Sequence, residues 1–284
     1  MTRPPPATAS LDAYLRDGVL DAELAALVWL TLDGGIPIVV AGEPGVGRRA
    51  LRDALLGLLP SGVRTIALSG AGETFGWMAE AGELGWRHDG SWVVETGADA
   101  GVDPGADRIR ARSGDGTTVL VADLEDAPPG GTWGEHARLT IRSLAVGYGM
   151  AATAAGARLE DVLGRLAAAP VGAIDDELTR LGIVLILGSD GDGATRVLAA
   201  YYLRPVARDV EGHIQRLPPA VLATWNRAAG RFDHFAWGVV GELAGRIGRR
   251  PVELEREQAV RARRLASRNA GGAPASIPPA PSTG

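Results

Sequence analysis

The sequence predicts an α/β fold with a mostly parallel central sheet, followed by a C-terminal helical region. Short apolar runs, each long enough for one buried strand, alternate with segments that carry apolar residues at helical spacing. Consecutive parallel strands need a crossover connection, usually a helix, so this alternation favours a sheet with helices on both faces. After about residue 207 the alternation stops, and residues 219–268 are expected to be helical.

The first elements run from a capped helix to an apolar strand. Asp21 is placed to cap a helix that continues to Leu32, with Leu24 and Leu27 on its inner face. The run IPIVVA, residues 36–41, is bounded by glycines and suits a strand covered on both faces. We then expect a helix at 48–59 stopped by Pro60, a strand at 63–68, a hairpin or edge strand at 92–95 and a buried strand at 117–123.

The remaining elements follow the same logic. The run IVLIL, residues 183–187, has the length and composition of another buried strand. The arginine-rich stretch at 253–268 predicts a charged, solvent-exposed helix, with docking of a partner as the alternative. We further expect helices at 132–146, 159–168 and 175–181 and strands at 150–154 and 195–206.

Composition limits the classes of function. The net charge of −5 argues against a general nucleic-acid binder. The chain has no cysteine, which excludes disulfides, thiolate metal ligands and cysteine nucleophiles. It also has no lysine, so all 29 cationic residues are arginine and no lysine is available to bind phosphate. The four histidines are far apart and lack the spacing of metal ligands.

The chain divides by composition into a core and two ends. We see no signal peptide, and the most apolar stretch, residues 24–42, is broken by Asp33 and Pro37, so we expect a cytoplasmic protein. The proline-rich ends are typical of flexible or disordered segments. The expected parts are a flexible N-terminus at 1–9, a core at 10–206, the helical region at 207–268 and a disordered tail at 269–284.

A glycine-rich turn follows the first strand and precedes a helix. Its spacing, Gly42, four residues, then Gly47, overlays the phosphate-binding loop of nucleotide-binding proteins. Glycines let backbone N–H groups curl around an anion, and the helix directs its positive N-terminus at it. An ordinary strand–turn–helix connection is the alternative. The predicted phosphate-binding residues are Gly42, Glu43, Pro44, Gly45, Val46, Gly47, Arg48, Arg49 and Ala50.

Two substitutions depart from the phosphate-loop pattern. Arg48 stands where the pattern has lysine, and Arg49 stands where it has the serine or threonine that binds Mg²⁺. Arginine keeps the positive charge, but its planar fork differs in shape and hydrogen bonding from an ammonium group. Arg49 has no hydroxyl for a metal. The pattern therefore predicts ATP or ADP binding and argues against Mg²⁺-dependent hydrolysis.

Residues 10–206 resemble the RecA-like motor core of the type II/type IV secretion and pilus-assembly ATPases, as a degenerate member. The helix before the phosphate loop and the order of the following segments are similar to that family. The resemblance implies an acidic residue after the second strand, matched by Glu73, and a carboxylate at the end of TTVLVAD, matched by Asp123. Both are predicted catalytic residues, and Asp123 is also the predicted metal ligand. A surface turn with acidic residues is the alternative for Asp123.

The resemblance extends to the segment AVGYGMAATAAGARLEDVLGRL, which has the layout of the family's histidine box. Thr153 is retained, but Tyr148 and Ala155 stand where the family has histidines. The departures from the family pattern fall on residues that bind phosphate or take part in hydrolysis, and not on surface loops. This distribution suggests that the scaffold has been kept while its hydrolytic activity has weakened.

Three functions follow as hypotheses. The first is a nucleotide-binding or regulatory protein of the secretion-ATPase type, with weak or no hydrolysis. The second is an active ATPase that powers type II/IV secretion or pilus assembly, and the third is an interaction module that binds no nucleotide. The resemblance implies a homo-hexamer, or a hetero-oligomer with an active paralogue, and an inner-membrane platform protein as partner. It gives no reason to expect nucleic acid.

Overall fold

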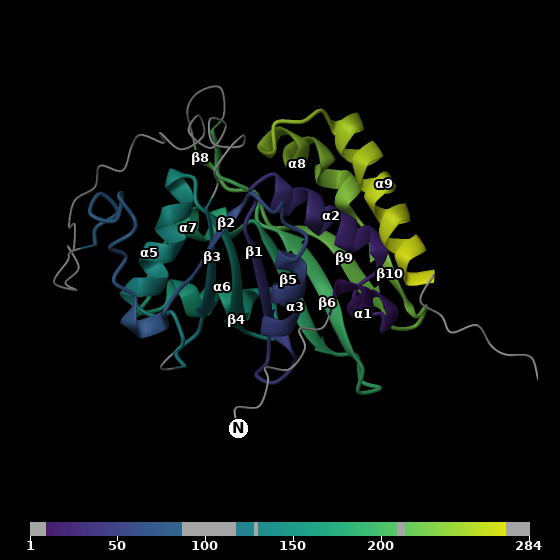
Figure 1. Ribbon diagram of the computed structural model, residues 1–284, viewed down its shortest axis with the longest axis horizontal. Coiled ribbons are helices and arrows are strands. Elements are labelled where there is room, and N and C mark those ends of the chain that lie inside the picture. The colour runs from purple at the N-terminus through teal and green to yellow at the C-terminus, as the bar shows by residue number, and fades with distance from the viewer. Residues whose placement is uncertain (1–9, 87–117, 128–129, 209–213, 271–284) are drawn as a thin grey trace, which may run out of the picture.

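The computed structural model of the 284-residue chain describes residues 10–86, 118–127, 130–208 and 214–270 (Figure 1). The hairpin or edge strand predicted at 92–95 and both terminal segments, 1–9 and 271–284, lie outside the described residues. Within them, helices cover both faces of an eight-stranded sheet, so the predicted α/β fold is confirmed. None of the described helices combines the length and apolar character that crossing a bilayer requires.

Five parallel strands form one side of the sheet. Their spatial order is β5-β1-β4-β3-β2, and each neighbouring pair is parallel. The strand that precedes the phosphate loop therefore lies between β4 and β5, which is the arrangement of RecA-like P-loop cores. The bounds are β1 (Ile38–Gly42), β2 (Arg64–Ala67), β3 (Thr118–Leu124), β4 (Gly149–Ala155) and β5 (Ile183–Ser189).

Three antiparallel strands extend the sheet beyond β5 and correct the prediction for the C-terminal region. They are β6 (Thr195–Tyr202), β9 (Ala220–Asn226) and β10 (Arg231–His234). We expected residues 219–268 to be helical throughout, but AVLATWN and RFDH form a hairpin whose Leu222 and Phe232 enter the core. Pairing with β6 satisfies the backbone hydrogen-bonding groups of β9, and this stabilisation outweighs the modest helical pattern of the sequence. A small ladder joins β7 (Ala207–Arg208) to β8 (Ile214–Gln215).

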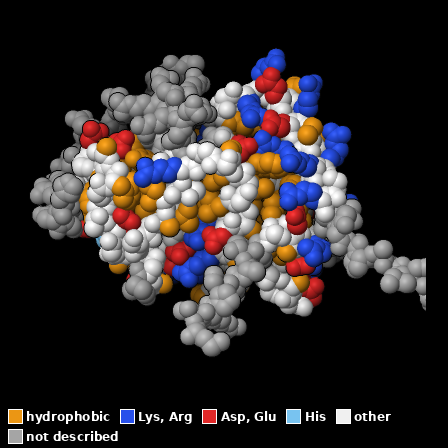
Figure 2. Space-filling model, in the orientation of Figure 1, with side chains coloured by type: hydrophobic (Ala, Val, Ile, Leu, Met, Phe, Trp, Pro, Cys, Tyr) orange, Lys and Arg blue, Asp and Glu red, His pale blue; other side chains and the backbone are white. Residues whose placement is uncertain are grey.

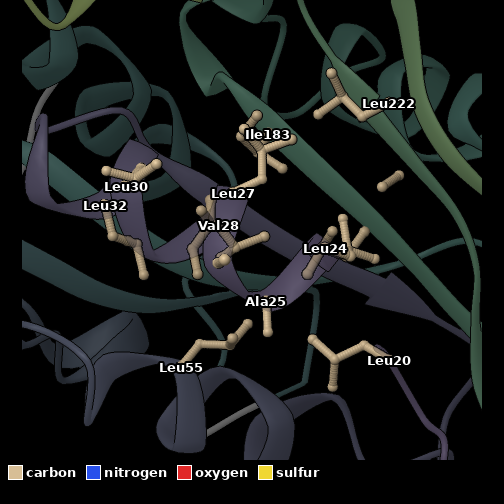
Figure 3. Close-up of a cluster of buried hydrophobic side chains, with 14 of the residues drawn as sticks. Leu20, Leu24, Ala25, Leu27, Val28, Leu30, Leu32, Leu55, Ile183 and Leu222 are labelled. Carbon is tan, nitrogen blue, oxygen red and sulfur yellow. The ribbon is translucent and has the colours of Figure 1, made fainter. Parts of the chain in front are cut away.

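Five helices and the larger core cluster cover one face of the sheet. Strand β1 shows the division, because Ile38 and Val40 join this cluster whereas Val39 and Ala41 face the opposite one. Figure 3 shows Leu24 and Leu27 of α2 among the packed side chains of this core. The helices are α1 (Leu11–Arg16), α2 (Ala22–Asp33), α3 (Arg48–Leu56), α8 (Val240–Arg246) and α9 (Pro251–Ala270).

Three helices cover the other face of the sheet. The aromatic segment around Phe75 packs beside them against β3 and α5, and includes Trp77 and Trp86. These helices are α5 (Glu135–Ser143), α6 (Leu159–Ala167) and α7 (Asp175–Leu178), and single 3₁₀ turns are η1 (Gly70–Gly72), η2 (Leu144–Val146), η3 (Thr179–Leu181) and η4 (Ala236–Val239).

Most helix boundaries agree with the sequence. Asp21 caps α2 as predicted, accepting a hydrogen bond from the backbone N–H of Leu24 at 2.9 Å. Helix α3 ends at Leu56, three residues before the predicted end, and the amides of Leu58 and Leu59 bond three residues back instead of four.

Helix α9 corrects a second expectation. We predicted a solvent-exposed charged helix, but α9 lies along α2 and buries Leu254 and Leu265 completely (Figure 1). Its Arg261 stacks 4.4 Å from the ring centre of Trp29 and pairs with Asp33 at 2.5 Å. The other arginines remain on the outer surface, where basic side chains gather over α9 in Figure 2.

Candidate phosphate-binding site

The turn between β1 and α3 is open and depends on glycine. Gly45 and Gly47 have φ values of 90° and 89°, in the left-handed region that residues with a Cβ atom rarely adopt. A Cβ atom at either position would meet no other atom within 4 Å. Glycine is therefore required at both positions by the backbone conformation and not by crowding, while Val46 of the same turn packs against the core.

Several N–H groups of this turn have no acceptor. Within the described part of the chain, no hydrogen bond is made by the amides of Gly45, Val46 and Gly47. The first three amides of α3, Arg48 to Ala50, have no intrahelical acceptor because they begin the helix. Free amides at a helix N-terminus suit an anion.

Asp123 and Glu125 lie next to this turn because of the sheet order. Strands β1, β4 and β3 are parallel neighbours, so their carboxyl ends meet at one edge of the sheet. Thr153 of β4 pairs with Asp123 of β3 on one side and with Val40 of β1 on the other. The loop that follows β1 therefore approaches the end of β3 although β4 separates the two strands.

Each oxygen of the two carboxylates accepts a hydrogen bond. Asp123 Oδ1 accepts from Arg52 Nη1 at 2.7 Å and from Thr153 Oγ1 at 2.6 Å, and its Oδ2 accepts from Arg49 Nε at 2.8 Å. Glu125 Oε1 accepts from Arg49 Nη2 at 2.9 Å, and its Oε2 accepts from Arg48 Nη2 at 2.9 Å. We call these six residues the arginine–carboxylate cluster.

The three arginines come from one face of α3. Arg48 and Arg52 are one turn apart, and Arg49 lies three residues before Arg52, so all three project together. The side chains of Arg48 and Arg52 are 9% exposed, whereas that of Arg49 is 55% exposed. Arg52 also donates to the carbonyl of Ala122 and pairs with Asp53. Arg48 Nη1 is buried and has no acceptor.

The side-chain charges around the cluster balance. Three guanidinium groups meet the carboxylates of Asp123 and Glu125, and Arg52 also pairs with Asp53 outside the cluster. Opposite charges within about 4 Å offset the cost of burying each ion. An anion entering the loop would meet the free amides, which carry partial positive charge, and the exposed guanidinium of Arg49.

Glu73 belongs to a separate, self-contained structure. Its buried carboxylate accepts hydrogen bonds from the backbone N–H groups of Ser69, Thr74 and Phe75 and from Trp77 Nε1, at 3.0 to 3.1 Å. Burial raises the pKa of Glu73, but these donors lower it further, so the net shift is downward. No described hydrogen bond or ion pair joins it to the arginine–carboxylate cluster. Its catalytic role stays a prediction.

The two positions expected for histidines have different surroundings. Tyr148 donates to Glu80 at 2.9 Å and packs against Trp77, so it faces the aromatic segment. Ala155 lies opposite Gly42, at the start of the loop. Among the described histidines, His136 contacts the carbonyl of Glu73 and His234 pairs with Asp21; His88 and His213 lie outside the described residues.

Arg52 is the site residue that sequence reasoning missed. A signal was present, because Arg52 lies between Leu51 and Asp53 on the helical face that also carries the apolar Leu51 and Leu55. An arginine on such a face needs an acidic partner. The sequence does not say which carboxylate that partner is.

The sheet order and the glycine turn together define an α/β protein with a RecA-like P-loop architecture. No protein-family model matches the chain, and no curated protein matches it. A similar solved structure is the VirB11 ATPase from the Brucella suis type IV secretion system in complex with sulphate, with 18% identity and a TM-score of 0.39. The alignment covers 70% of this chain and 66% of that one, just under two thirds of its length.

Proposed function

We propose that the chain binds the phosphate groups of ATP or ADP in the loop at residues 42–50 and hydrolyses ATP weakly or not at all. The observation that carries this proposal is the glycine turn with free amides beside the exposed guanidinium of Arg49. Arg48 and Arg49 supply cationic donors in place of the missing lysine. Residues 10–206 form the nucleotide-binding unit of this proposal.

The same cluster supports the proposal of weak hydrolysis. Orienting a water for attack on a phosphate requires a carboxylate or amide with a free acceptor. All four carboxylate oxygens of Asp123 and Glu125 accept from arginines or Thr153. These donors occupy part of the acceptor capacity of both carboxylates, which makes either one a weaker acceptor for an attacking water.

A retained scaffold without free catalytic groups suits a regulatory role. We propose that the chain is a degenerate relative of the secretion and pilus-assembly ATPases and acts in the cytoplasm beside an active paralogue at a membrane platform. The sequence resemblance and the RecA-like strand order support this assignment. Co-purification of the chain with such an ATPase from its native cells tests it, and recovery of the chain without any ATPase would contradict it.

Calorimetric titration with ADP tests nucleotide binding. We expect binding by the parent protein and an affinity lower by about tenfold in Arg49→Ala, since a charge-assisted contact to phosphate is lost. Arg158→Ala is the matched control, because Arg158 is an exposed arginine that pairs with Asp161 on α6. Absence of ADP binding by the parent would instead favour the interaction module.

Phosphate release separates a weak from a working ATPase. We expect the parent to release phosphate far more slowly than about one per second, the lower end of ordinary enzymatic rates. The double variant Arg48→Lys/Arg49→Thr restores the residue types of the phosphate-loop pattern and should raise the rate. A parent protein that turns over at an ordinary rate would establish the active-ATPase alternative.

A further inference from the structure

The residues at the candidate site do not fit Mg²⁺. The ion needs several oxygen ligands in near-octahedral geometry, usually carboxylates, hydroxyls, waters and phosphate oxygens. Position 49 supplies a guanidinium where the phosphate-loop pattern has a hydroxyl, and the oxygens of Asp123 and Glu125 already accept from arginines or Thr153. Among the described residues, no group of three or more acidic or histidine side chains is arranged to hold a metal ion.

Charge also disfavours the ion. Three guanidinium groups already pair with the carboxylates of Asp123, Glu125 and Asp53, so a divalent cation would meet no uncompensated negative charge and would lie close to the three arginines. Like charges within a few ångströms repel strongly in a partly buried site. Arg52 is the least replaceable of the three arginines, because it is buried and also bound to Ala122 and Asp53.

We propose that the site binds nucleoside di- and triphosphates free of Mg²⁺, with Arg49 and Arg52 standing where the metal would be. This inference rests on the proposed nucleotide binding and specifies its ligand. Arg52 holds Asp123 in place, and the exposed Arg49 is free to exchange its carboxylate contacts for phosphate oxygens. Added Mg²⁺ lowers the affinity because the metal occupies phosphate oxygens that the arginines and amides would otherwise contact.

Titration with ADP in excess EDTA and in excess MgCl₂ tests the inference. We expect ADP to bind more tightly in EDTA than in MgCl₂, by about threefold or more. Equal binding in the two conditions, or tighter binding in MgCl₂, overturns the inference while leaving the proposed nucleotide binding intact. Absence of binding in both conditions overturns the proposed function, and this inference with it.

An Arg49→Thr variant tests the role given to the arginine. It exposes Asp123 Oδ2 and Glu125 Oε1 and adds the hydroxyl that the pattern requires. We expect the ratio of ADP affinity in MgCl₂ to that in EDTA to rise by about tenfold. Arg158→Thr should leave the ratio unchanged, and circular dichroism checks that both variants fold. An unchanged ratio in Arg49→Thr would show that Arg49 does not replace the metal.

Discussion

Arg52 Nη1 donates to Asp123 Oδ1 over 2.7 Å, although the two residues are 71 positions apart. The contact joins α3, which follows the phosphate loop, to the end of β3, which carries the predicted catalytic carboxylate. The sequence alone would assign this carboxylate to a metal ion or a water, but the contact makes it part of a partly buried ion pair.

Replacing Arg52 by methionine should destabilise the fold by about 2 to 4 kcal/mol, because Asp123 keeps a partly buried charge with fewer donors. The double variant Arg52→Met/Asp123→Asn should lose less than the sum of the two single variants, since the carboxylate is then uncharged. Urea unfolding measures all three. Strict additivity would mean that the contact contributes no coupling energy.

Thr153→Val should destabilise the protein by about 1 to 2 kcal/mol. The change replaces a fully buried hydroxyl, which donates to Asp123 at 2.6 Å, with a methyl group of similar size. Thr153→Ser keeps the hydroxyl and should retain more of the stability. Thermal unfolding of the two variants provides the comparison, and equal losses would point to packing and not to the hydrogen bond.

Folding stability should depend on pH through His234, whose Nε2 lies 2.8 Å from Asp21 Oδ2. Burial lowers the pKa of His234, but Asp21, Glu23 and Asp233 raise it further, so it lies above its ordinary value of 6.5. The protonated form therefore stabilises the fold. Its contribution is complete below pH 6.5 and is lost as pH rises through the raised pKa.

Nuclear magnetic resonance titration of His234 checks this prediction directly. Asp21→Asn should return the pKa toward its ordinary value and flatten the dependence of unfolding free energy on pH. Asparagine also caps helices well, so the variant keeps the start of α2 intact. If Asp21→Asn leaves the pKa of His234 unchanged, the ion pair with Asp21 does not raise that pKa.

Two substitutions on α9 test whether the helix is packed. Leu265→Ala should cost about 2 to 4 kcal/mol, because Leu265 is fully buried in the larger core cluster. Val260→Ala lies on the same helix but is half exposed, and its cost should stay below about 0.5 kcal/mol. Chemical denaturation measures both losses of unfolding free energy. If both are similarly small, the solvent-exposed helix that the sequence predicts is correct.

Local patterns predicted the parallel part of the fold well. The apolar strands β1, β3 and β5 and the helix cap at Asp21 depend on residues a few positions apart. The hairpin β9–β10 and the packed face of α9 were missed, because each is stabilised by partners far along the chain.

The sequence by itself determined the strand–turn–helix around Gly45 and Gly47 and the replacement of lysine and hydroxyl by two arginines. Only the tertiary structure decided what those arginines touch. Their partners depend on the strand order that places β4 between β1 and β3, and so brings the ends of all three strands to the loop. Periodicity and turn chemistry act over a few residues, whereas the pairing of Arg52 with Asp123 depends on how distant strands are arranged in the sheet.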